Sequence, residues 1–263
     1  MLLAIDIGNT HTVFGIYKNS TLLGSWRVTS FTTRTEDEFG ALVKTFCENA
    51  KIPLKKISVV GISSVVPNLT ETVSRMSKKY FALEPIIISA DLSLGINVLY
   101  DDPFAVGADR LCNAVAAFTK YQSPLIIVDF GTATTYDVVS KAGDYLGGVI
   151  TAGVETSAAE LHRRAAKLPK IELRFPENVI GKNTVHSMQS GILYGALDAM
   201  ESMIRRITKE LGEQPIVIAT GGFSEMLCRH SKLIHHHEPN LVLDGIRIIV
   251  EKVALHHKKK RSS

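Results

Sequence analysis

Two short loops of the sequence combine an aspartate, a glycine and hydroxyl-bearing residues directly after an apolar run. The first is DIGNTHT at residues 6–12, and the second is DFGTAT at residues 129–134. The glycine of each loop permits a tight turn, whose backbone N–H groups can surround phosphate oxygens. The carboxylates of Asp6 and Asp129 repel phosphate unless a cation lies between them, and Mg²⁺ is typically held by carboxylate and phosphate oxygens. The two loops together predict a polyphosphate site, although either aspartate alone could simply end a strand and cap a turn.

A third glycine turn follows another apolar run. Thr220, Gly221 and Gly222 come directly after the strand-like segment 215–219. A glycine pair lets a ligand approach the backbone closely, so we expect a nucleoside to bind at this turn. The sequence contains no G-x-x-x-x-G-K-[ST], no G-x-G-x-x-G and no G-x-S-x-G pattern. The candidate chemistry therefore depends on the three turns and not on a P-loop, a dinucleotide-binding turn or a nucleophile elbow.

The elements that carry these loops repeat along the chain. At an offset of 123 residues, the residues Leu2, Asp6, Gly8 and Thr12 align with Leu125, Asp129, Gly131 and Thr135. Each loop follows a buried-strand run, LLAID or LIIVD, and precedes two further runs rich in β-branched residues that are separated by a turn. Four identities can arise by chance, but recurrence of the whole three-strand pattern at one offset favours duplication.

Helices and further strands complete each half of the chain. The patterns predict helices over 35–50, 68–81 and 187–211, strands over 57–62, 85–88 and 215–219, and a helix after 222. The order β-β-β-α-β-α-β, present twice, indicates a duplicated α/β fold of two lobes, each with a mixed sheet flanked by helices. We predict an N-terminal lobe at 1–122, a C-terminal lobe at 123–255 and a disordered basic tail at 256–263.

The composition is that of an ordinary globular protein. Of the 263 residues, 45% are hydrophobic and 21% are charged, which excludes the collagen-like, disordered and disulfide-framework classes. Removing the four basic residues at 258–261 from the total of 30 leaves 26, equal to the 26 acidic residues. We therefore expect neither nucleic acid nor a membrane as a partner. Three distant cysteines and the lack of a secretory signal predict a cytoplasmic protein.

An ordered set of segments gives the chain a family resemblance. The segments are DIGNTHT at 6–12, GADR at 107–110, DFGTATTYDVV at 129–139, YLGGVITAG at 145–153, GKNT at 181–184, ATGG at 219–222 and PNLVLDGIRI at 239–248. Together they resemble type III pantothenate kinases, which share a fold with actin, hexokinase, acetate kinase and the large heat-shock chaperones. The resemblance covers about residues 1–250. Ala152 stands where the family commonly has proline before Gly153, a difference confined to a turn.

The resemblance implies a duplicated ribonuclease H-like (actin-like ATPase) fold and an ATP-dependent kinase. The implied reaction transfers the γ-phosphoryl group of ATP to the primary hydroxyl of pantothenate, and it gives 4′-phosphopantothenate at the start of coenzyme A synthesis. By the same resemblance, Asp109 is the base that accepts the hydroxyl proton, a role worth about 10²–10⁴-fold in rate. Taken without the family, Asp109 could equally form a capping or intrahelical ion pair with Arg110.

The resemblance also assigns binding residues. ATP is expected at Asp6, Gly8, Asn9, Thr10, His11, Thr12, Val13, Gly131, Thr132, Gly221 and Gly222. Pantothenate is expected at Tyr100, Gly107, Ala108, Asp109, Arg110 and Thr184, with Arg110 pairing with its carboxylate. Thr184 is expected from the neighbouring subunit of a homodimer with shared active sites, formed through the C-terminal lobe. Asp6 is expected to hold Mg²⁺, directly or through water, and Asp129 a monovalent cation, K⁺ or NH₄⁺. His11 either touches phosphate or faces solvent.

Two other functions stay open at this point. The chain could be a nucleotide-binding accessory protein in transcriptional regulation on the same fold, or a kinase of another small hydroxy-acid or sugar. A regulator needs the ATP loops but not Asp109, Arg110 and Thr184 together, and the sequence contains all three. The run of histidines at 235–237 invites a metal-binding interpretation. Alternate side chains of a strand point to opposite faces, however, so we expect an exposed sheet edge there.

Overall fold

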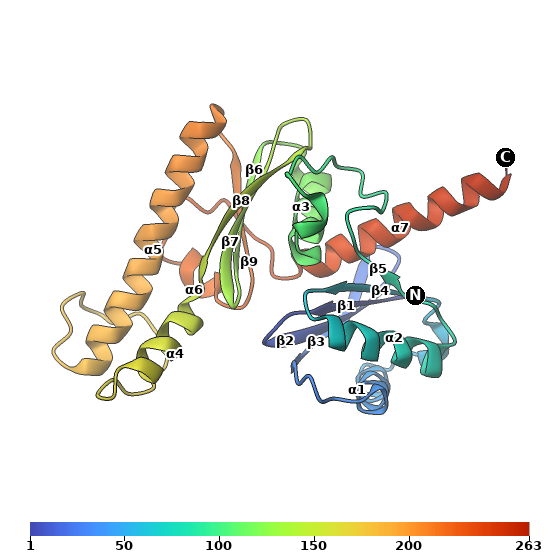
Figure 1. Cartoon of the computed structure of the whole chain (residues 1–263), viewed down its shortest axis with the longest axis horizontal. Coiled ribbons are helices and arrows are strands. Elements are labelled where there is room, and N and C mark those ends of the chain that lie inside the picture. The colour runs from blue at the N-terminus through green and yellow to red at the C-terminus, as the bar shows by residue number, and fades with distance from the viewer. Residues whose placement is uncertain (263) are drawn as a thin grey trace. The chain divides into compact units, whose positions relative to one another are not determined.

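The chain folds into two compact units. The computed structural model describes residues 1–262, with side chains described for residues 1–255. One unit consists of Met1–Lys120 with Asn240–Ser263, and the other of Tyr121–Pro239. Each unit contains a five-stranded mixed sheet flanked by helices (Figure 1). The strand orders β3-β2-β1-β4-β5 and β8-β7-β6-β9-β10 correspond one to one. The predicted duplicated α/β fold is therefore confirmed.

The sheet of the first unit places Asp6 and its loop at one end of the central strand. Its strands are β1 (Leu2–Ile7), β2 (His11–Lys18), β3 (Thr21–Thr29), β4 (Val59–Ser64) and β5 (Ile86–Ile87). Strand β1 pairs antiparallel with β2 and parallel with β4. Because successive side chains of a strand alternate between faces, Leu3 and Ile5 lie on one face of β1 and Asp6 on the other.

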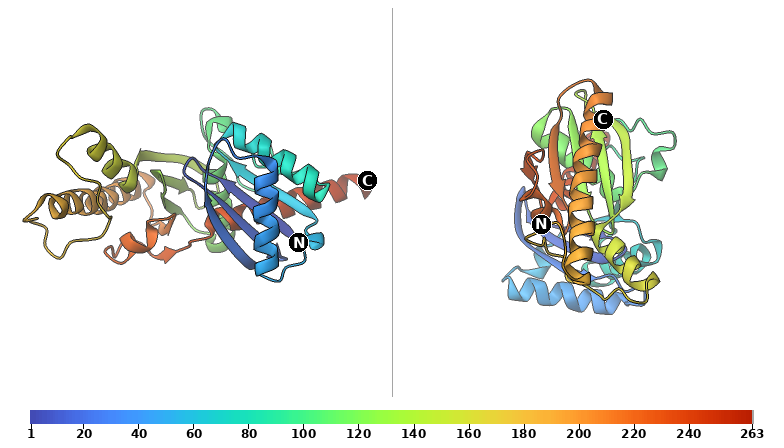
Figure 2. Two further views of the ribbon diagram at one scale, coloured as in Figure 1. Left: turned by 90° about the horizontal axis from the view of Figure 1, so that it is seen from below. Right: turned by 90° about the vertical axis from the view of Figure 1, so that its left-hand side faces the viewer.

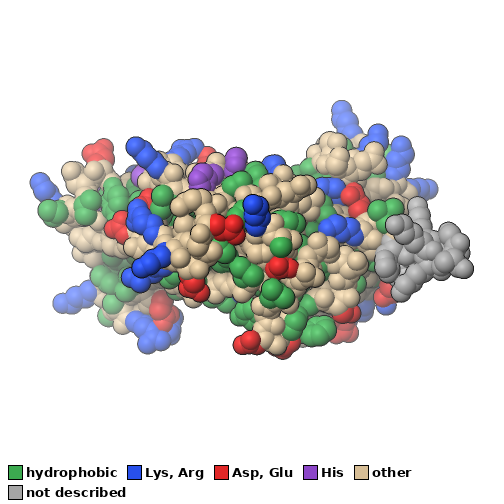
Figure 3. Space-filling view, turned by 90° about the horizontal axis from the view of Figure 1, so that it is seen from above, with side chains coloured by type: hydrophobic (Ala, Val, Ile, Leu, Met, Phe, Trp, Pro, Cys, Tyr) green, Lys and Arg blue, Asp and Glu red, His purple; other side chains and the backbone are tan. Residues whose placement is uncertain are grey.

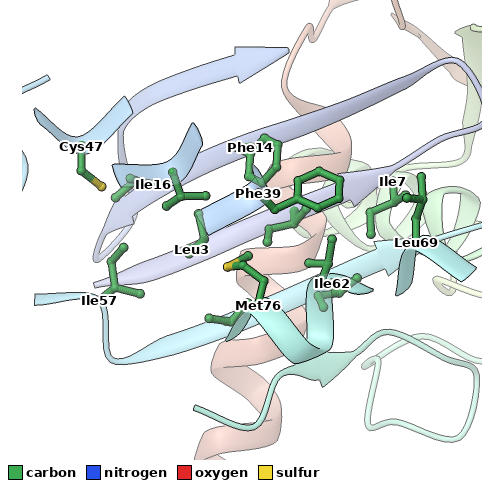
Figure 4. Packing of buried hydrophobic residues seen from close by; sticks show 14 of the residues in the cluster. Leu3, Ile7, Phe14, Ile16, Phe39, Cys47, Ile57, Ile62, Leu69 and Met76 are labelled. Atoms are coloured by element: carbon green, nitrogen blue, oxygen red, sulfur yellow. The ribbon is translucent and has the colours of Figure 1, made fainter. Parts of the chain in front are cut away.

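Helices cover both faces of this sheet (Figure 2). These helices are α1 (Glu36–Asn49), α2 (Pro67–Phe81) and α7 (Leu241–Ser262). The first unit also contains α3 (Ala108–Tyr121), which packs on α7 at Gly245, and short 3-10 helices at Leu54–Lys56 and Pro103–Ala105. Apolar side chains of α1 and α2, such as Phe39 and Met76, pack with Leu3 and Phe14 in one buried cluster (Figure 4). Helix α1 begins where the sequence predicts, because Thr35 and Glu38 form a reciprocal capping box.

The last helix returns to the first sheet. Helix α7 packs against β1, β2 and β4. Gly61 makes this approach possible, because a Cβ there would lie 2.7 Å from side-chain atoms of Ile246 and Val250. The chain thus builds the first unit from both of its ends. The side chains of the predicted basic tail at 256–263 lie outside the described residues, as does the whole of Ser263.

The second unit repeats this arrangement with one long helix. Its strands are β6 (Leu125–Phe130), β7 (Ala133–Val139), β8 (Tyr145–Ala152), β9 (Ile216–Thr220) and β10 (His236–His237). Its helices are α4 (Val154–Arg164), α5 (Thr184–Leu211) and α6 (Ser224–Cys228). Met200 and Ile204 of α5 pack with Val128 of β6 in a buried cluster. Helix α5 starts three residues before the predicted position, because the Asn183 side chain accepts a hydrogen bond from the His186 N–H (2.8 Å).

Charged side chains are mixed on the surface. On the face drawn in Figure 3, lysines and arginines are interspersed with aspartates and glutamates. Among the described residues, no helix is both long enough and apolar enough to cross a membrane.

Candidate active site

The first loop is a tight turn between β1 and β2. The Gly8 N–H donates to the His11 carbonyl (2.9 Å), which closes the turn. Asn9 and His11 are exposed at its tip, whereas Thr12 is fully buried and its hydroxyl bonds to the Ser30 hydroxyl (2.8 Å). Asn9, His11 and the backbone of the turn are therefore accessible to a ligand. The Thr12 side chain lies in the protein interior and does not face that ligand.

Asp6 is held by a serine that the sequence analysis missed. In the parallel β1–β4 register, Asp6 lies opposite Ser63, and on its antiparallel side it lies opposite Val13. Ser63 is fully buried and its hydroxyl donates to Asp6 Oδ1 (2.9 Å). A hydrogen bond to a carboxylate is stronger than one between neutral groups. The only sequence signal for this contact was a pair of serines at the end of a strand that runs parallel to β1.

The start of α3 supplies the candidate base. Asp109 lies in the first turn of this helix, and its Oδ1 accepts the Arg110 N–H (2.8 Å). Burial raises the pKa of the Asp109 carboxyl, and the Arg110 N–H and guanidinium oppose this rise. Gly107 leaves room for the carboxylate, because a Cβ at Gly107 would lie 2.5 Å from Asp109 Oδ1. A half-buried carboxylate of raised pKa beside a loop is an arrangement suited to proton transfer.

A buried thiol in the first unit is affected by both Asp6 and Asp109. Cys112 of α3 is fully buried, and burial raises the pKa of its thiol well above the ordinary value. The carboxylates of Asp6 and Asp109 add to this rise, and Ser63 hydrogen-bonds to the thiol. The fold thus gathers two carboxylates that are far apart in the sequence around one neutral thiol. Cys112 and Ser63 are the two members of this cluster that motif reasoning did not find.

The remaining predicted acceptor residues are divided between the units. Ala108 is buried at the start of α3, the Arg110 side chain is 7% exposed, and Tyr100 lies in the preceding loop with 38% exposure. Thr184 belongs to the second unit and is the first residue of α5. There it lines a cavity of about 580 Å³ whose other walls come from α4, α5, β7 and β8.

The second loop has the same construction as the first. The Gly131 N–H donates to the Ala133 carbonyl (3.0 Å), so the turn between β6 and β7 closes tightly around Thr132. The Thr132 carbonyl accepts the Gly153 N–H (3.0 Å) and the Thr156 hydroxyl (2.6 Å). A Cβ at Gly153 would lie 2.3 Å from the Gly131 carbonyl oxygen. The loop therefore rests directly on the backbone that leads into α4.

The third turn lies against the second loop. Strands β6 and β9 are parallel neighbours, with Asp129 opposite Thr220, so their carboxyl ends meet at one edge of the sheet. Gly221 has φ +91°, and a Cβ there would lie 2.4 Å from Asp129 Oδ1 and 2.6 Å from the Phe130 nitrogen. Only glycine fits this close approach. The exposed Gly222 follows, so the backbone of the turn is open to a ligand beside the Asp129 carboxylate.

Metal-binding side chains are sparse in the described part of the chain. It contains no group of three or more histidine, cysteine, aspartate or glutamate residues arranged to hold an ion. Mg²⁺ sites in proteins commonly combine one or two carboxylates with the oxygens of a bound phosphate. The carboxylates of Asp6 and Asp129 at the strand ends suit this hard cation.

Solved structures share this two-unit α/β fold. A Campylobacter jejuni protein assigned to the Baf family of transcriptional activators is 18% identical, with a TM-score of 0.61, and the match covers 95% of this chain and 98% of that one. The ethanolamine utilization protein EutJ from Carboxydothermus hydrogenoformans is 13% identical, with a TM-score of 0.53 over 94% and 89% of the two chains. At these identities the matches show the fold alone, a two-unit α/β fold with mixed sheets.

Sequence comparison shows the family. The family model described as type III pantothenate kinase matches residues 2–206. The type III pantothenate kinase of Myxococcus xanthus is 45% identical over 249 residues, which is 95% of this chain and 97% of that protein. The enzyme of the same name from Anaeromyxobacter sp. is 45% identical over 252 residues, 96% of this chain and 99% of that protein. The chain belongs to the type III pantothenate kinase family.

Proposed function

We propose that this enzyme transfers the γ-phosphoryl group of ATP to the primary hydroxyl of pantothenate and so makes 4′-phosphopantothenate, the first step of coenzyme A synthesis. Family membership supports the reaction. The observation that carries it at the level of residues is the half-buried Asp109 carboxylate in the first turn of α3, whose pKa is raised by burial. The three cysteines form no disulfide, which suits a cytoplasmic enzyme.

Asp109 acts as the base in this proposal. Its raised pKa makes the carboxylate a stronger base than an exposed aspartate. It accepts the proton of the attacking hydroxyl as the new O–P bond forms, and ADP leaves with the electrons of the broken bond. Because the transition state of phosphoryl transfer is loose, positioning and charge neutralisation contribute at least as much as the base.

The three glycine turns bind the nucleotide in this proposal. The exposed backbone N–H groups of the Asn9 and Thr132 loops bind phosphate oxygens, and the turn at Gly221 and Gly222 binds the nucleoside. Bound Mg²⁺ would neutralise phosphate charge, and Asp6 is the residue that would hold it. Ser63 keeps the Asp6 carboxylate in one orientation for this task.

Asp129 is the proposed ligand of a monovalent cation, K⁺ or NH₄⁺. Support comes from the packing of Gly221, which places backbone directly beside Asp129 Oδ1. Carboxylate and backbone oxygens are hard ligands that suit such a cation. Its charge would offset that of the nucleotide phosphates. Titration of the kinase rate with K⁺ and NH₄⁺ at fixed ionic strength tests this part, and equal rates without either ion would reject it.

Arg110 is proposed to recognise the carboxylate of pantothenate. Its side chain is 7% exposed, and a guanidinium can bind a carboxylate through two parallel hydrogen bonds. An Arg110→Lys variant keeps the charge but loses this paired geometry. We expect its KM for pantothenate to rise at least tenfold while its KM for ATP stays close to wild type. An unchanged pantothenate KM would reject this role.

The enzyme is proposed to be a homodimer in which Thr184 completes the acceptor site of the partner subunit. Support comes from exposed apolar side chains of the same unit: Ile150, Val179 and Ile180 are 61%, 65% and 83% exposed. Exposed apolar side chains of this size become favourable to bury when a partner subunit covers them. Mixing an Asp109→Asn variant with a Thr184→Val variant tests the sharing. Exchanged dimers should regain activity that neither variant has alone, and mixtures that stay inactive despite subunit exchange would reject shared sites.

A panel of acceptors tests the proposed reaction itself. ADP release from ATP is measured with pantothenate, with other small hydroxy-acids and with sugars, each with and without K⁺. Pantothenate should be the acceptor with the highest kcat/KM. The regulatory alternative has no observation in its favour, because the likeness to the Campylobacter jejuni protein concerns the fold alone. If the chain binds ATP but releases ADP with none of these acceptors, the result would favour the regulatory alternative over a kinase.

A further inference from the structure

The three consecutive histidines of the second unit have three separate roles. His235 Nδ1 accepts the Val217 N–H (2.8 Å), and the His236 ring stacks on Tyr121 with 4.6 Å between ring centroids. His237 Nε2 lies 2.8 Å from the Ser224 hydroxyl. The run is therefore not a metal site, and His237 is the member that contacts α6, the helix directly after the proposed nucleotide turn.

The contact between His237 and Ser224 has a defined direction. Ser224 is 1% exposed, and its hydroxyl also lies 2.6 Å from the Gly221 carbonyl oxygen. A carbonyl only accepts, so the single hydroxyl proton of Ser224 goes to Gly221. The Ser224 oxygen must then accept from His237 Nε2–H. The result is a chain of two hydrogen bonds from β10, through the first residue of α6, to the turn.

The Ser224 hydroxyl bond to the Gly221 carbonyl (2.6 Å) is shorter than the backbone bonds around the turn. The backbone bonds around it are long: the Ser224 N–H lies 3.3 Å from the Gly221 carbonyl, and the Phe223 N–H lies 3.4 Å from the Phe130 carbonyl. His237 is itself fixed, because β10 pairs in parallel with β9 and the Glu238 N–H donates to the Ala219 carbonyl (2.9 Å). The sheet edge thus serves as the rigid support.

We propose that His237 is a positioning residue for nucleotide binding, which acts through Ser224 to hold the Gly221–Gly222 turn against the end of β6. This inference rests on the proposed function, because that function assigns the nucleoside to the turn. Gly221 packs closely on Asp129 and Phe130. A shift of the turn therefore also moves backbone away from Asp129, the proposed cation ligand. Pantothenate binding, assigned to the first unit and to Thr184, should not depend on His237.

Variants of His237 separate the hydrogen bond from the ring. His237→Phe keeps a flat ring and loses the donor, whereas His237→Gln offers an amide N–H in place of Nε2–H. His236→Phe is the matched control, because it lies on the same short strand and keeps its stack on Tyr121. Loss of one neutral hydrogen bond predicts an ATP KM about 3- to 10-fold higher for His237→Phe. The pantothenate KM should stay within about twofold, and His237→Gln and His236→Phe should resemble wild type.

Hydrogen exchange of the protein without nucleotide gives a second readout that needs no turnover. The backbone amides of residues 221–224 should exchange several-fold faster in His237→Phe than in wild type or in His236→Phe. Ser224→Ala removes both bonds and should exchange at least as fast as His237→Phe, and adding His237→Phe to Ser224→Ala should change nothing further. Wild-type exchange and ATP KM in His237→Phe would overturn the proposal. Equal defects in His237→Phe and His237→Gln would also overturn it, because the ring and not the bond would then matter. Hydrogen exchange needs no acceptor substrate, so it tests the role of His237 even if the kinase does not phosphorylate pantothenate.

Discussion

Gly107 tests whether the position of the Asp109 carboxylate controls the reaction. Changing Gly107 to alanine places a Cβ 2.5 Å from Asp109 Oδ1, and ordinary contacts begin at 3.4 Å. The carboxylate oxygen must therefore move by about 0.9 Å. A misplacement of about 1 Å at a reacting group can cost about 100-fold in rate. We expect kcat for pantothenate phosphorylation to fall by about that factor.

The fold should tolerate this substitution. The next nearest atoms to the new Cβ are a methyl of Val65 at 3.6 Å and Asp109 Cγ at 3.7 Å, which are normal contacts. Gly107 does not have a positive φ, and replacing such a glycine with alanine lowers the entropy of the unfolded chain. Circular dichroism and thermal melting of Gly107→Ala should therefore match wild type. The predicted result is a folded enzyme with a specific catalytic defect.

A matched control and a clear failure complete the test. Gly195→Ala lies in α5, where a Cβ would meet nothing within 4 Å, so kcat should stay at the wild-type value. Steady-state ADP release with saturating pantothenate and ATP measures both variants. If Gly107→Ala retains wild-type kcat, Asp109 either is not the base or is not placed by the space at Gly107.

Three further variants test the site through activity and stability. Asp109→Asn should lower kcat by about 10²–10⁴-fold, and wild-type turnover would remove Asp109 from the mechanism. Because burial raises the folded-state pKa of Asp109, its ionisation costs stability above that pKa. Asp109→Asn should therefore melt higher than wild type at pH 7–8, and this gain should vanish below about pH 4, where the carboxyl is protonated in both states. Ser63→Ala should lower the free energy of unfolding, measured in urea, by about 1.5–3 kcal/mol, because the Ser63 hydroxyl donates to the Asp6 carboxylate. Ser64→Ala should lower it by less, because Ser64 bonds to the Val66 N–H, and equal losses in the two variants would contradict this reasoning. Gly153→Ala should lower the free energy of unfolding by about 1–3 kcal/mol, because its Cβ meets only backbone of the second loop; an unchanged urea midpoint would refute the close packing.

Local sequence patterns were sufficient to predict the duplicated fold. The runs LLAID and LIIVD became the central strands β1 and β6, and in each sheet the same neighbours surround them. Short-range signals also located α1 and α5, whose ends are set by side-chain caps. Helix α7 escaped prediction because its partners, including Gly61, are far away in the sequence. Gly61 lies within a strand pattern, and nothing in that pattern predicts that α7, from the other end of the chain, packs on it.

The loops of the candidate site could be found from residue types and spacing, but their supports could not. The spacing of Asp6, Gly8 and Asn9 predicts a turn, and the structure has that turn. By contrast, the Ser63 bond to Asp6 depends on which strand pairs with β1, and the Cys112 position depends on how α3 packs. His237 was recognised only as part of a histidine run. Its contact with Ser224 arises from the pairing of β10 with β9.

Identification of the product of ATP and pantothenate tests the central claim most directly. The purified enzyme is incubated with both compounds, Mg²⁺ and K⁺, and the product is examined by mass spectrometry and phosphorus NMR. We predict one phosphoryl group on the primary hydroxyl, ADP in equal amount, and almost no product with Asp109→Asn. Absence of pantothenate-dependent ADP release, or a phosphoryl group on another position, would contradict the assignment of this chain's reaction.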